Sequence, residues 1–315
     1  MMRNKIIIEA PAKINLTLDV IGKRDDGYHE LETVMHQIDL FDRITLEARE
    51  QGIKLAASST GIPLDEDNLA YKAALAILKK YGQETGVSIF IEKNIPIGAG
   101  LAGGSTDAAA VLAGINYLYG ARFSYQDLLV MAAAIGSDVA FCLSEHYSEN
   151  YSGILMSPGA TAIARGRGEI LEPLPAQTIP FILMVKPGFQ LSTAQVYGEF
   201  DLGAVNHSPD TGSFLQAWYN NDIINIAAHM GNVLESVSIM KKPEIGIIKA
   251  RMKEQGAINA LMSGSGPSVF GIFPNEAAAR QAFTEFKQDY REVYLVSSYR
   301  RGDRNGRKKT VTGKP

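Results

Sequence analysis

A glycine-rich segment in the first half of the chain has the composition of a phosphate-binding loop. Residues 96–105 read PIGAGLAGGS, and an alanine-rich run that predicts a helix over 105–119 follows directly. Glycines let backbone N–H groups approach a ligand closely, and a helix N-terminus adds about half a positive charge. Together these features predict a cradle for phosphate that needs no net basic surface.

Three known phosphate or nucleotide loops can be tested against this segment. A Walker A loop fails, because Gly104 stands where that motif needs lysine. The spacing of Gly98, Gly100 and Gly103 satisfies the dinucleotide fingerprint, but no acidic residue ends a strand about 20 residues later. The protein-kinase set fails too, since neither HRD nor DFG occurs. The loop therefore belongs to another class.

The elements around the loop alternate between strands and helices without a simple βαβ order. Period-two alternation predicts a strand over 14–20, and cap residues and apolar periodicity predict helices. A Pro-rich stretch at 172–175 is the predicted domain boundary. Further strands are predicted at 44–48, 87–91, 180–185, 269–273 and 293–297, and helices at 68–78, 105–119, 124–136, 192–200, 222–234, 243–255 and 276–286. The fold class predicted from this order is mixed α+β.

Composition excludes several classes of protein. The 315 residues are 46% hydrophobic and 21% charged, which is typical of a globular chain of about two domains. Residues 300–315 hold seven basic side chains and one acid, so the preceding residues carry 24 basic and 33 acidic side chains, a net of −9. A body this acidic is a poor surface for nucleic acid. The basic tail is predicted to be solvated and disordered.

Cysteine usage and hydropathy give the predicted compartment. One cysteine, Cys142, cannot form an internal disulfide, and no stretch approaches the ~18 apolar residues of a membrane span. The N-terminal run MMRNKIIIE places an acid after three apolar residues, too soon for a signal peptide. We therefore expect a cytoplasmic protein with neither a membrane nor a nucleic-acid partner.

Three motifs in order resemble the GHMP kinase superfamily. The loop is similar to its nucleotide-binding motif, PAKINL at 11–16 precedes it, and SGSGPSVF at 263–270 follows it. The resemblance implies a two-domain fold with the active-site cleft between the domains. The N-terminal domain, 1–174, would be ribosomal protein S5 domain 2-like, and the C-terminal domain, 175–299, ferredoxin-like. The basic tail, 300–315, lies beyond the resemblance. A monomer or homodimer is expected.

Four further segments are similar to superfamily members whose alcohol substrate carries a cytidyl group. They are GYHE at 27–30, GSDV at 136–139, GRGE at 166–169 and STAQVY at 192–197. The resemblance implies ATP-dependent phosphorylation of a small cytidyl substrate in isoprenoid precursor synthesis, with Mg²⁺. One alternative is a member that phosphorylates mevalonate or homoserine, but these substrates have no base to stack. The other is a non-catalytic nucleotide-binding paralogue.

The resemblance also implies roles for individual residues. Asp138 matches the catalytic aspartate that accepts the proton of the alcohol, and Lys13 the lysine beside it. Asn68 and Lys93 match positions near the adenine, and no metal ligand is predicted beyond Ser105. The predicted nucleotide-binding residues are Asn68, Lys93, Pro96, Gly98, Gly100, Leu101, Ala102, Gly103, Gly104 and Ser105, and the predicted substrate-binding residues are Asn15, Tyr28, His29, Thr193 and Tyr197.

Two departures from the superfamily pattern follow Asp138. Many members have proline after the Asp-Val of this turn, where this chain has Ala140. The stretch from Asp138 to Gly166 is also longer than expected, and we expect its excess, 145–158, to be a surface excursion between strands. Both departures bear on the placement of the carboxylate.

Overall fold

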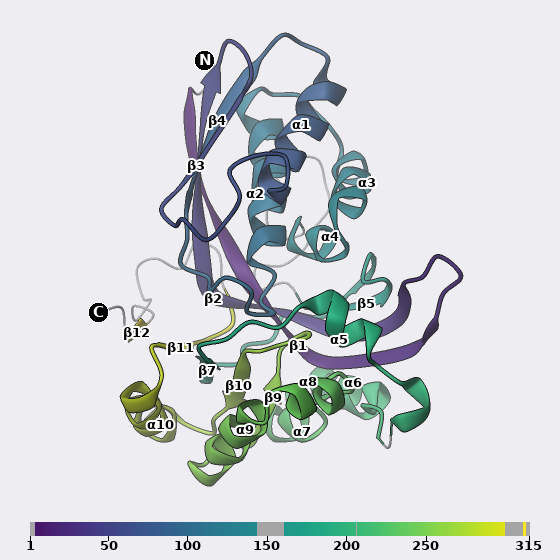
Figure 1. Ribbon diagram of the computed structural model, residues 1–315, viewed down its shortest axis with the longest axis vertical. Helices are drawn as coiled ribbons and strands as arrows, with labels where there is room; N and C mark the ends of the chain where they lie inside the picture. Colours follow the sequence, from purple (N-terminus) through teal and green to yellow (C-terminus); the bar gives the residue numbers. More distant parts are fainter. Residues whose placement is uncertain (1–3, 144–160, 206, 300–310, 313–315) are drawn as a thin grey trace. The chain divides into compact units, whose positions relative to one another are not determined.

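The computed structural model describes residues 4–143, 161–205, 207–299 and 311–312 (Figure 1). The chain divides into two compact units. The first holds residues 1–12, 40–97 and 102–160, and the second holds residues 13–39, 98–101 and 161–315. Strands β1 (Lys5–Lys23) and β2 (His29–Arg49) contribute residues to both units. The predicted boundary at 174–175 falls inside the second unit of this division, because these long strands interleave the units along the sequence.

The first unit places four helices against a small sheet. Strand β4 (Gly86–Glu92) pairs antiparallel with β2 and parallel with β3 (Ile53–Ala57). Figure 1 shows the helices gathered on one side of β3 and β4. These helices are α1 (Leu69–Tyr81), α2 (Gly103–Leu118), α3 (Tyr125–Ile135) and α4 (Ser137–Leu143).

Local signals for the helix ends are confirmed in this unit. The Asn68 side chain accepts the N–H of Ala70 at the start of α1, and Gly82 ends it in the left-handed region. Ser124 and Asp127 form the capping box of α3. These ends were predictable because each depends on residues that are neighbours in sequence.

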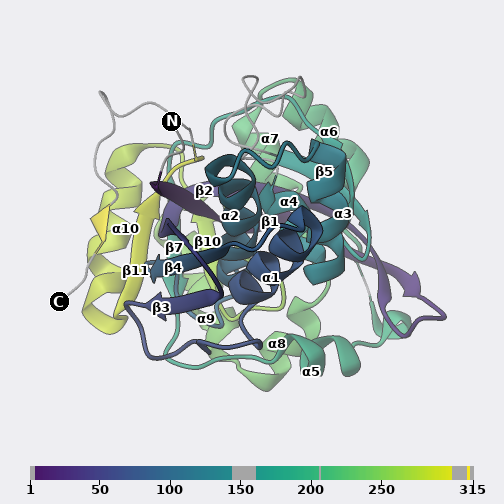
Figure 2. The ribbon, with the colours of Figure 1, turned by 90° about the horizontal axis from the view of Figure 1, so that it is seen from above.

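The second unit contains a five-stranded antiparallel sheet in the order β12-β11-β7-β10-β9. Helices α9 (Glu244–Glu254) and α10 (Glu276–Asp289) pack on it, and Figure 2 shows α10 beside β11. A large apolar cluster that includes Leu183, Val269 and Phe286 fills the space between sheet and helices. The strands are β7 (Ile182–Lys186), β9 (Asn259–Met262), β10 (Val269–Ile272), β11 (Glu292–Val296) and β12 (Val311–Thr312).

Further elements of this unit attach to β1 and β2. β5 (Thr161–Gly166) pairs antiparallel with β2 and with β6 (Ile170–Pro173), and β8 (Gly231–Asn232) pairs parallel with β1. The remaining helices are α5 (Thr193–Gly198), α6 (Thr211–Tyr219), α7 (Ile223–Ala228), α8 (Glu235–Lys241) and a short 3₁₀ helix (Leu202–Ala204). Of the predicted tail, 311–312 are described, and they pair with β11.

The structure corrects one predicted helix and adds two helices that were not predicted. The helix predicted over 222–234 ends at Ala228, because Gly231 and Asn232 pair with β1 instead. The Asn232 amide also donates to the carbonyls of Met262 and Gly264, both at 2.8 Å. Helices α6 and α8 were not predicted. Tertiary contacts decided these positions.

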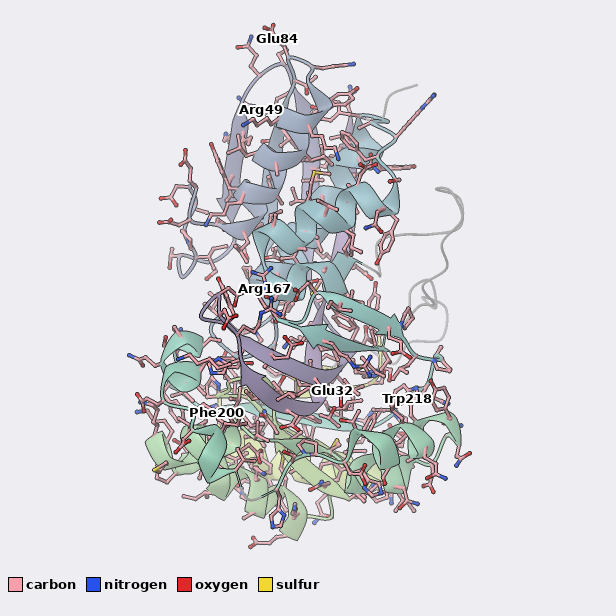
Figure 3. All side chains as sticks on the ribbon, turned by 90° about the vertical axis from the view of Figure 1, so that its right-hand side faces the viewer. Glu32, Arg49, Glu84, Arg167, Phe200 and Trp218 are labelled. Carbon is pink, nitrogen blue, oxygen red and sulfur yellow. The ribbon has the colours of Figure 1, made fainter. Side chains whose placement is uncertain are left out.

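A buried histidine joins several segments of the second unit. The ring nitrogens of His36 lie 2.7 Å from the hydroxyls of Thr161 and Ser298, and Ser298 also accepts the N–H of Ile179 at 2.7 Å. The ring meets Trp218 (labelled in Figure 3) edge-on, with centroids 5.7 Å apart. Burial lowers the pKa of His36 to about 3. The imidazole is therefore neutral in the folded protein at physiological pH.

We expect this histidine to make the protein less stable in mild acid. The unfolded chain protonates His36 near its ordinary pKa of about 6.5, whereas the folded protein does not until about 3. The contribution of neutral His36 to the free energy of unfolding is fully present above about pH 6.5. Below that pH it falls by about 1.4 kcal/mol per pH unit. Urea unfolding at about pH 7.5 and about pH 5 should show a fall of about 2 kcal/mol that His36→Gln lacks. His207→Gln, at an exposed histidine, should keep the full fall.

Candidate functional site

The first half of the glycine-rich loop is enclosed by the other two motifs, all within the second unit. The backbone N–H of Lys13 donates to the carbonyl of Leu101 at 3.1 Å. The Ser263 hydroxyl donates to the Gly100 carbonyl at 3.0 Å, and the N–H of Ser268 to the Ala99 carbonyl at 3.3 Å. The three segments that carry the resemblance are thus brought together in space.

Gly100 needs to be glycine for two reasons. Its φ of 76° lies in the left-handed region, and a Cβ there would collide with the backbone carbonyl of Ser263 and lie 2.9 Å from that of Gly266. The SGSG segment was part of the resemblance to the superfamily, but no role in the site was predicted for its residues. The contact of this segment with the loop, between Ser263 and Gly100, joins residues 163 positions apart in sequence.

The second half of the loop forms the N-terminus of α2, in the first unit. Ala102 takes the left-handed conformation at the N-cap, with φ of 57°, and its side chain makes no capping hydrogen bond. No acidic residue lies in the first turn, where Gly103, Gly104 and Ser105 stand. Backbone N–H groups without a side-chain cap, at the positive end of a 16-residue helix, suit an anion.

The two residues predicted near the adenine have their polar side-chain atoms engaged in the first unit. The side-chain oxygen of Asn68, Oδ1, caps α1, and its side-chain nitrogen, Nδ2, donates to the Pro63 carbonyl at 2.7 Å. The Lys93 ammonium is paired with the carboxylates of Asp42 and Asp107, the latter at 2.8 Å. Their contacts with a nucleotide stay a prediction.

Asp138 lies in the first turn of α4, and it is half-buried. The predicted turn at this position is therefore a helix, with Val139 donating its N–H to the Gly136 carbonyl just before it. Ala140 is buried inside α4, a position that alanine suits as the best helix former. The described elements on either side of the long stretch after it are α4 and β5, and the predicted excursion, 145–158, lies outside the described residues.

Lys13 begins a buried chain of hydrogen bonds in the second unit. Its ammonium donates to Asn15 Oδ1 at 2.8 Å, and Asn15 Nδ2 donates to the Thr33 hydroxyl at 2.8 Å. Thr33 donates in turn to the Thr17 carbonyl at 2.5 Å. The Lys13 residue is 4% exposed. A Cβ on Gly264 would lie 3.7 Å from its Nζ, so the third motif also borders the ammonium.

Aromatic rings gather around His29 in the second unit. The His29 ring lies 5.3 Å from the Tyr197 ring and meets the Phe200 ring edge-on at 6.3 Å. Burial, and secondarily Lys23, lowers the pKa of His29, so the imidazole is neutral at physiological pH. A neutral imidazole can donate one hydrogen bond and accept another, as recognition of a pyrimidine edge requires.

The other predicted substrate residues have partners in the same unit. The Arg167 guanidinium lies over the exposed ring of Tyr28, 5.1 Å from the ring centroid. The hydroxyls of Thr193 and Ser265 lie 2.9 Å apart. Phe200 and Arg167 (both labelled in Figure 3) were not among the predicted substrate-binding residues. Each stood close to a quoted signal, Phe200 three residues after Tyr197 and Arg167 inside GRGE.

The described part of the chain lacks two features. Among those residues, no group of three or more His, Cys, Asp or Glu side chains could hold a metal ion. No helix among them is long and apolar enough to cross a membrane.

Two family models and several known proteins are similar to this chain. The GHMP kinases N terminal domain matches residues 68–146, and the GHMP kinases C terminal domain matches residues 214–292. A 4-diphosphocytidyl-2-C-methyl-D-erythritol kinase from Syntrophomonas wolfei subsp. wolfei is 58% identical over 298 residues, which are 95% of this chain and all of the relative.

Two solved structures are also similar to this chain. A crystal structure of 4-(cytidine 5'-diphospho)-2C-methyl-D-erythritol kinase superposes with a TM-score of 0.76 at 33% identity, covering 93% of this chain and 98% of the other. The homoserine kinase from Cytophaga hutchinsonii superposes with a TM-score of 0.72 at 20% identity, covering 99% and 97%. The second likeness shows a shared fold alone.

Proposed function

Because the chain belongs to the GHMP kinase family, we propose that it transfers a phosphoryl group from ATP to the 2-hydroxyl of 4-diphosphocytidyl-2-C-methyl-D-erythritol. The step would belong to isoprenoid precursor synthesis by the methylerythritol phosphate pathway. The observation that carries the choice of substrate is the 58% identical relative of that name, matched over its whole length. The ring contact between His29 and Tyr197 supports it, because mevalonate and homoserine have no base to stack.

The loop and the first turn of α2 would bind the phosphates of ATP. Their supporting features are the Gly100 backbone, the uncapped N-terminus at Ala102 and the lack of an acid in the first turn. Mg²⁺ would suit such a site, since it keeps several waters and binds mainly to phosphate oxygens, and the Ser105 hydroxyl is the protein oxygen that would be available to it. When bound, it would offset charge on the transferring phosphoryl group.

Asp138 and Lys13 would act on the reacting alcohol. A carboxylate can accept the proton of a hydroxyl that attacks phosphorus, and an ammonium stabilises the negative charge of the transferring group. Asn15 would hold the Lys13 ammonium in place through its 2.8 Å hydrogen bond. The predicted cleft, the cytoplasmic location and the oligomeric state stay predictions.

A kinase assay coupled to ADP release tests the proposal directly. The cytidyl substrate, mevalonate and homoserine are offered separately with ATP and Mg²⁺, and turnover of the cytidyl substrate alone is expected. Turnover of mevalonate or homoserine without turnover of the cytidyl substrate would contradict the proposed substrate. ATP binding without turnover of any alcohol would favour the non-catalytic paralogue.

Replacing His29 with alanine should weaken binding of the cytidyl substrate specifically. The change would remove the proposed hydrogen bond to the base, worth about 1 kcal/mol. It would also remove the ring that contacts Tyr197 and so helps to hold Tyr197 in place. We expect KM for the cytidyl substrate to rise roughly tenfold or more and KM for ATP to stay the same. His207→Ala, at an exposed position, is the control. A rise in KM for ATP of the same size would remove His29 from the cytidyl site.

A further inference from the structure

A buried ionic cluster in the first unit joins three segments of the chain. The Lys93 ammonium, just after β4, is paired with Asp42 on β2 and lies 2.8 Å from Asp107 on α2. The side chains of Lys93, Asp42 and Asp107 are 6%, 0% and 3% exposed. Such an arrangement is costly to bury, and it persists where close geometry and additional hydrogen bonds compensate for lost hydration.

The second oxygen of Asp42 holds the segment that enters the glycine-rich loop. Asp42 Oδ1 accepts the backbone N–H of Asn94 at 2.5 Å and that of Ile95 at 2.9 Å. The Asn94 amide also donates to the Phe41 carbonyl at 3.2 Å. The cluster therefore fixes both the chain just before the loop and, through Asp107, the helix just after it.

The cluster also touches the first residue of that helix. A Cβ built on Gly103 would lie 3.3 Å from Lys93 Nζ and 3.2 Å from Ile95 Cγ2, which is closer than ordinary contact. Gly103 thus sits directly against the ammonium and the segment that Asp42 holds. Any shift of Lys93 changes the support beneath the first turn of α2.

Burial shifts the pKa values of two members of the cluster. Burial raises the pKa of Asp107 to about 8, although Lys93 opposes the shift. Burial lowers the pKa of Lys93, but the two carboxylates outweigh it and raise the pKa overall. A raised pKa of Asp107 reduces the negative charge behind a helix N-terminus that would bind phosphate.

We propose that Lys93, Asp42 and Asp107 are positioning residues for the nucleotide. They would hold Gly103 and the first turn of α2 where the backbone N–H groups meet phosphate, and Lys93 would act through that helix instead of touching the base. The inference rests on the proposed function only in that α2 binds the phosphates of a nucleotide. It assigns Lys93 a different role from the adenine contact expected from the sequence.

The experiment compares two nucleotides that differ in the base. Binding of ATP and GTP to wild type and Lys93→Met is measured by calorimetry, without the alcohol substrate. A positioning role predicts that both affinities fall by the same factor, roughly 10- to 100-fold, the loss expected when a hydrogen bond to a charged phosphate is weakened. A loss confined to ATP would show that Lys93 contacts adenine and would overturn the proposal. Lys80→Met, which breaks an exposed 2.8 Å ion pair with Asp127, is the matched control.

A second variant separates positioning from folding. Lys93→Met alone leaves an unpaired buried carboxylate, which can unfold a protein. Lys93→Met with Asp42→Asn removes both charges and keeps an oxygen to accept the N–H groups of Asn94 and Ile95. If this folded double variant binds both nucleotides as tightly as wild type, the proposal is wrong. Because binding is the readout, the test stands even if the enzyme phosphorylates another alcohol.

Discussion

An Asp138→Asn enzyme is expected to turn over at least ~10²-fold more slowly than wild type, with its affinity for ATP little changed. Asparagine has nearly the same shape as aspartate, but its amide cannot accept the proton of the attacking hydroxyl. Since Asp138 is half-buried in the first turn of α4, the substitution should disturb its surroundings little. The measurement is kcat with the cytidyl substrate, together with the Kd for ATP from calorimetry.

The control for this result is another carboxylate changed in the same way. Asp289→Asn breaks an exposed ion pair with Arg251 and should leave kcat unchanged. A rate for Asp138→Asn equal to that of wild type would remove Asp138 from the mechanism. A parallel loss of ATP affinity would mean that the residue acts in nucleotide binding instead.

The second large effect is expected from Lys13→Met. Loss of the ammonium that we propose stabilises the transferring phosphoryl group should lower kcat by roughly 10²- to 10³-fold, as removal of one electrostatic stabiliser does in other enzymes. The free energy of unfolding should change by less than about 2 kcal/mol. The lost hydrogen bond to Asn15 is offset, because burying an ammonium that is 4% exposed is itself costly.

A second buried lysine provides a matched comparison for Lys13. Lys186 is 8% exposed, and its ammonium lies 2.7 Å from Glu292 and 3.2 Å from the Pro187 carbonyl. Lys186→Met should change stability on the same scale as Lys13→Met without changing kcat. Equal losses of kcat in both variants would mean that the rate reports disturbed packing and not the charge of Lys13.

Local chemistry was predictable from the sequence because its signals lie within a few residues. The caps at Asn68 and Ser124 are examples, and the glycine-rich loop leads into a helix as predicted. Pairs of residues distant in sequence were not predictable. Asp42 reads as one more polar residue of a strand, and nothing nearby indicates that it meets Lys93, 51 positions later.

In the candidate site, too, local motifs were predictable and contacts between distant residues were not. The three motifs were recognised separately, but the backing of Gly100 by Ser263 required the folded chain. The ring contact of His29 with Tyr197 joined two predicted residues, whereas Phe200 lies just outside the STAQVY segment and was not predicted. Periodicity also failed at 222–234, since pairing of Gly231 with β1 outweighs the helical tendency of that segment.

The interleaving of the two units has a consequence for synthesis on the ribosome. Residues 13–39 of the second unit are made early, but their partners in it, β5 and β8, are made only after the whole sequence of the first unit. β11, which covers one edge of β7, comes later still. A nascent chain that stops before β11 would leave β7 with an open edge, a known template for aggregation. Truncated translation products of this enzyme should therefore depend strongly on chaperones and be degraded rapidly.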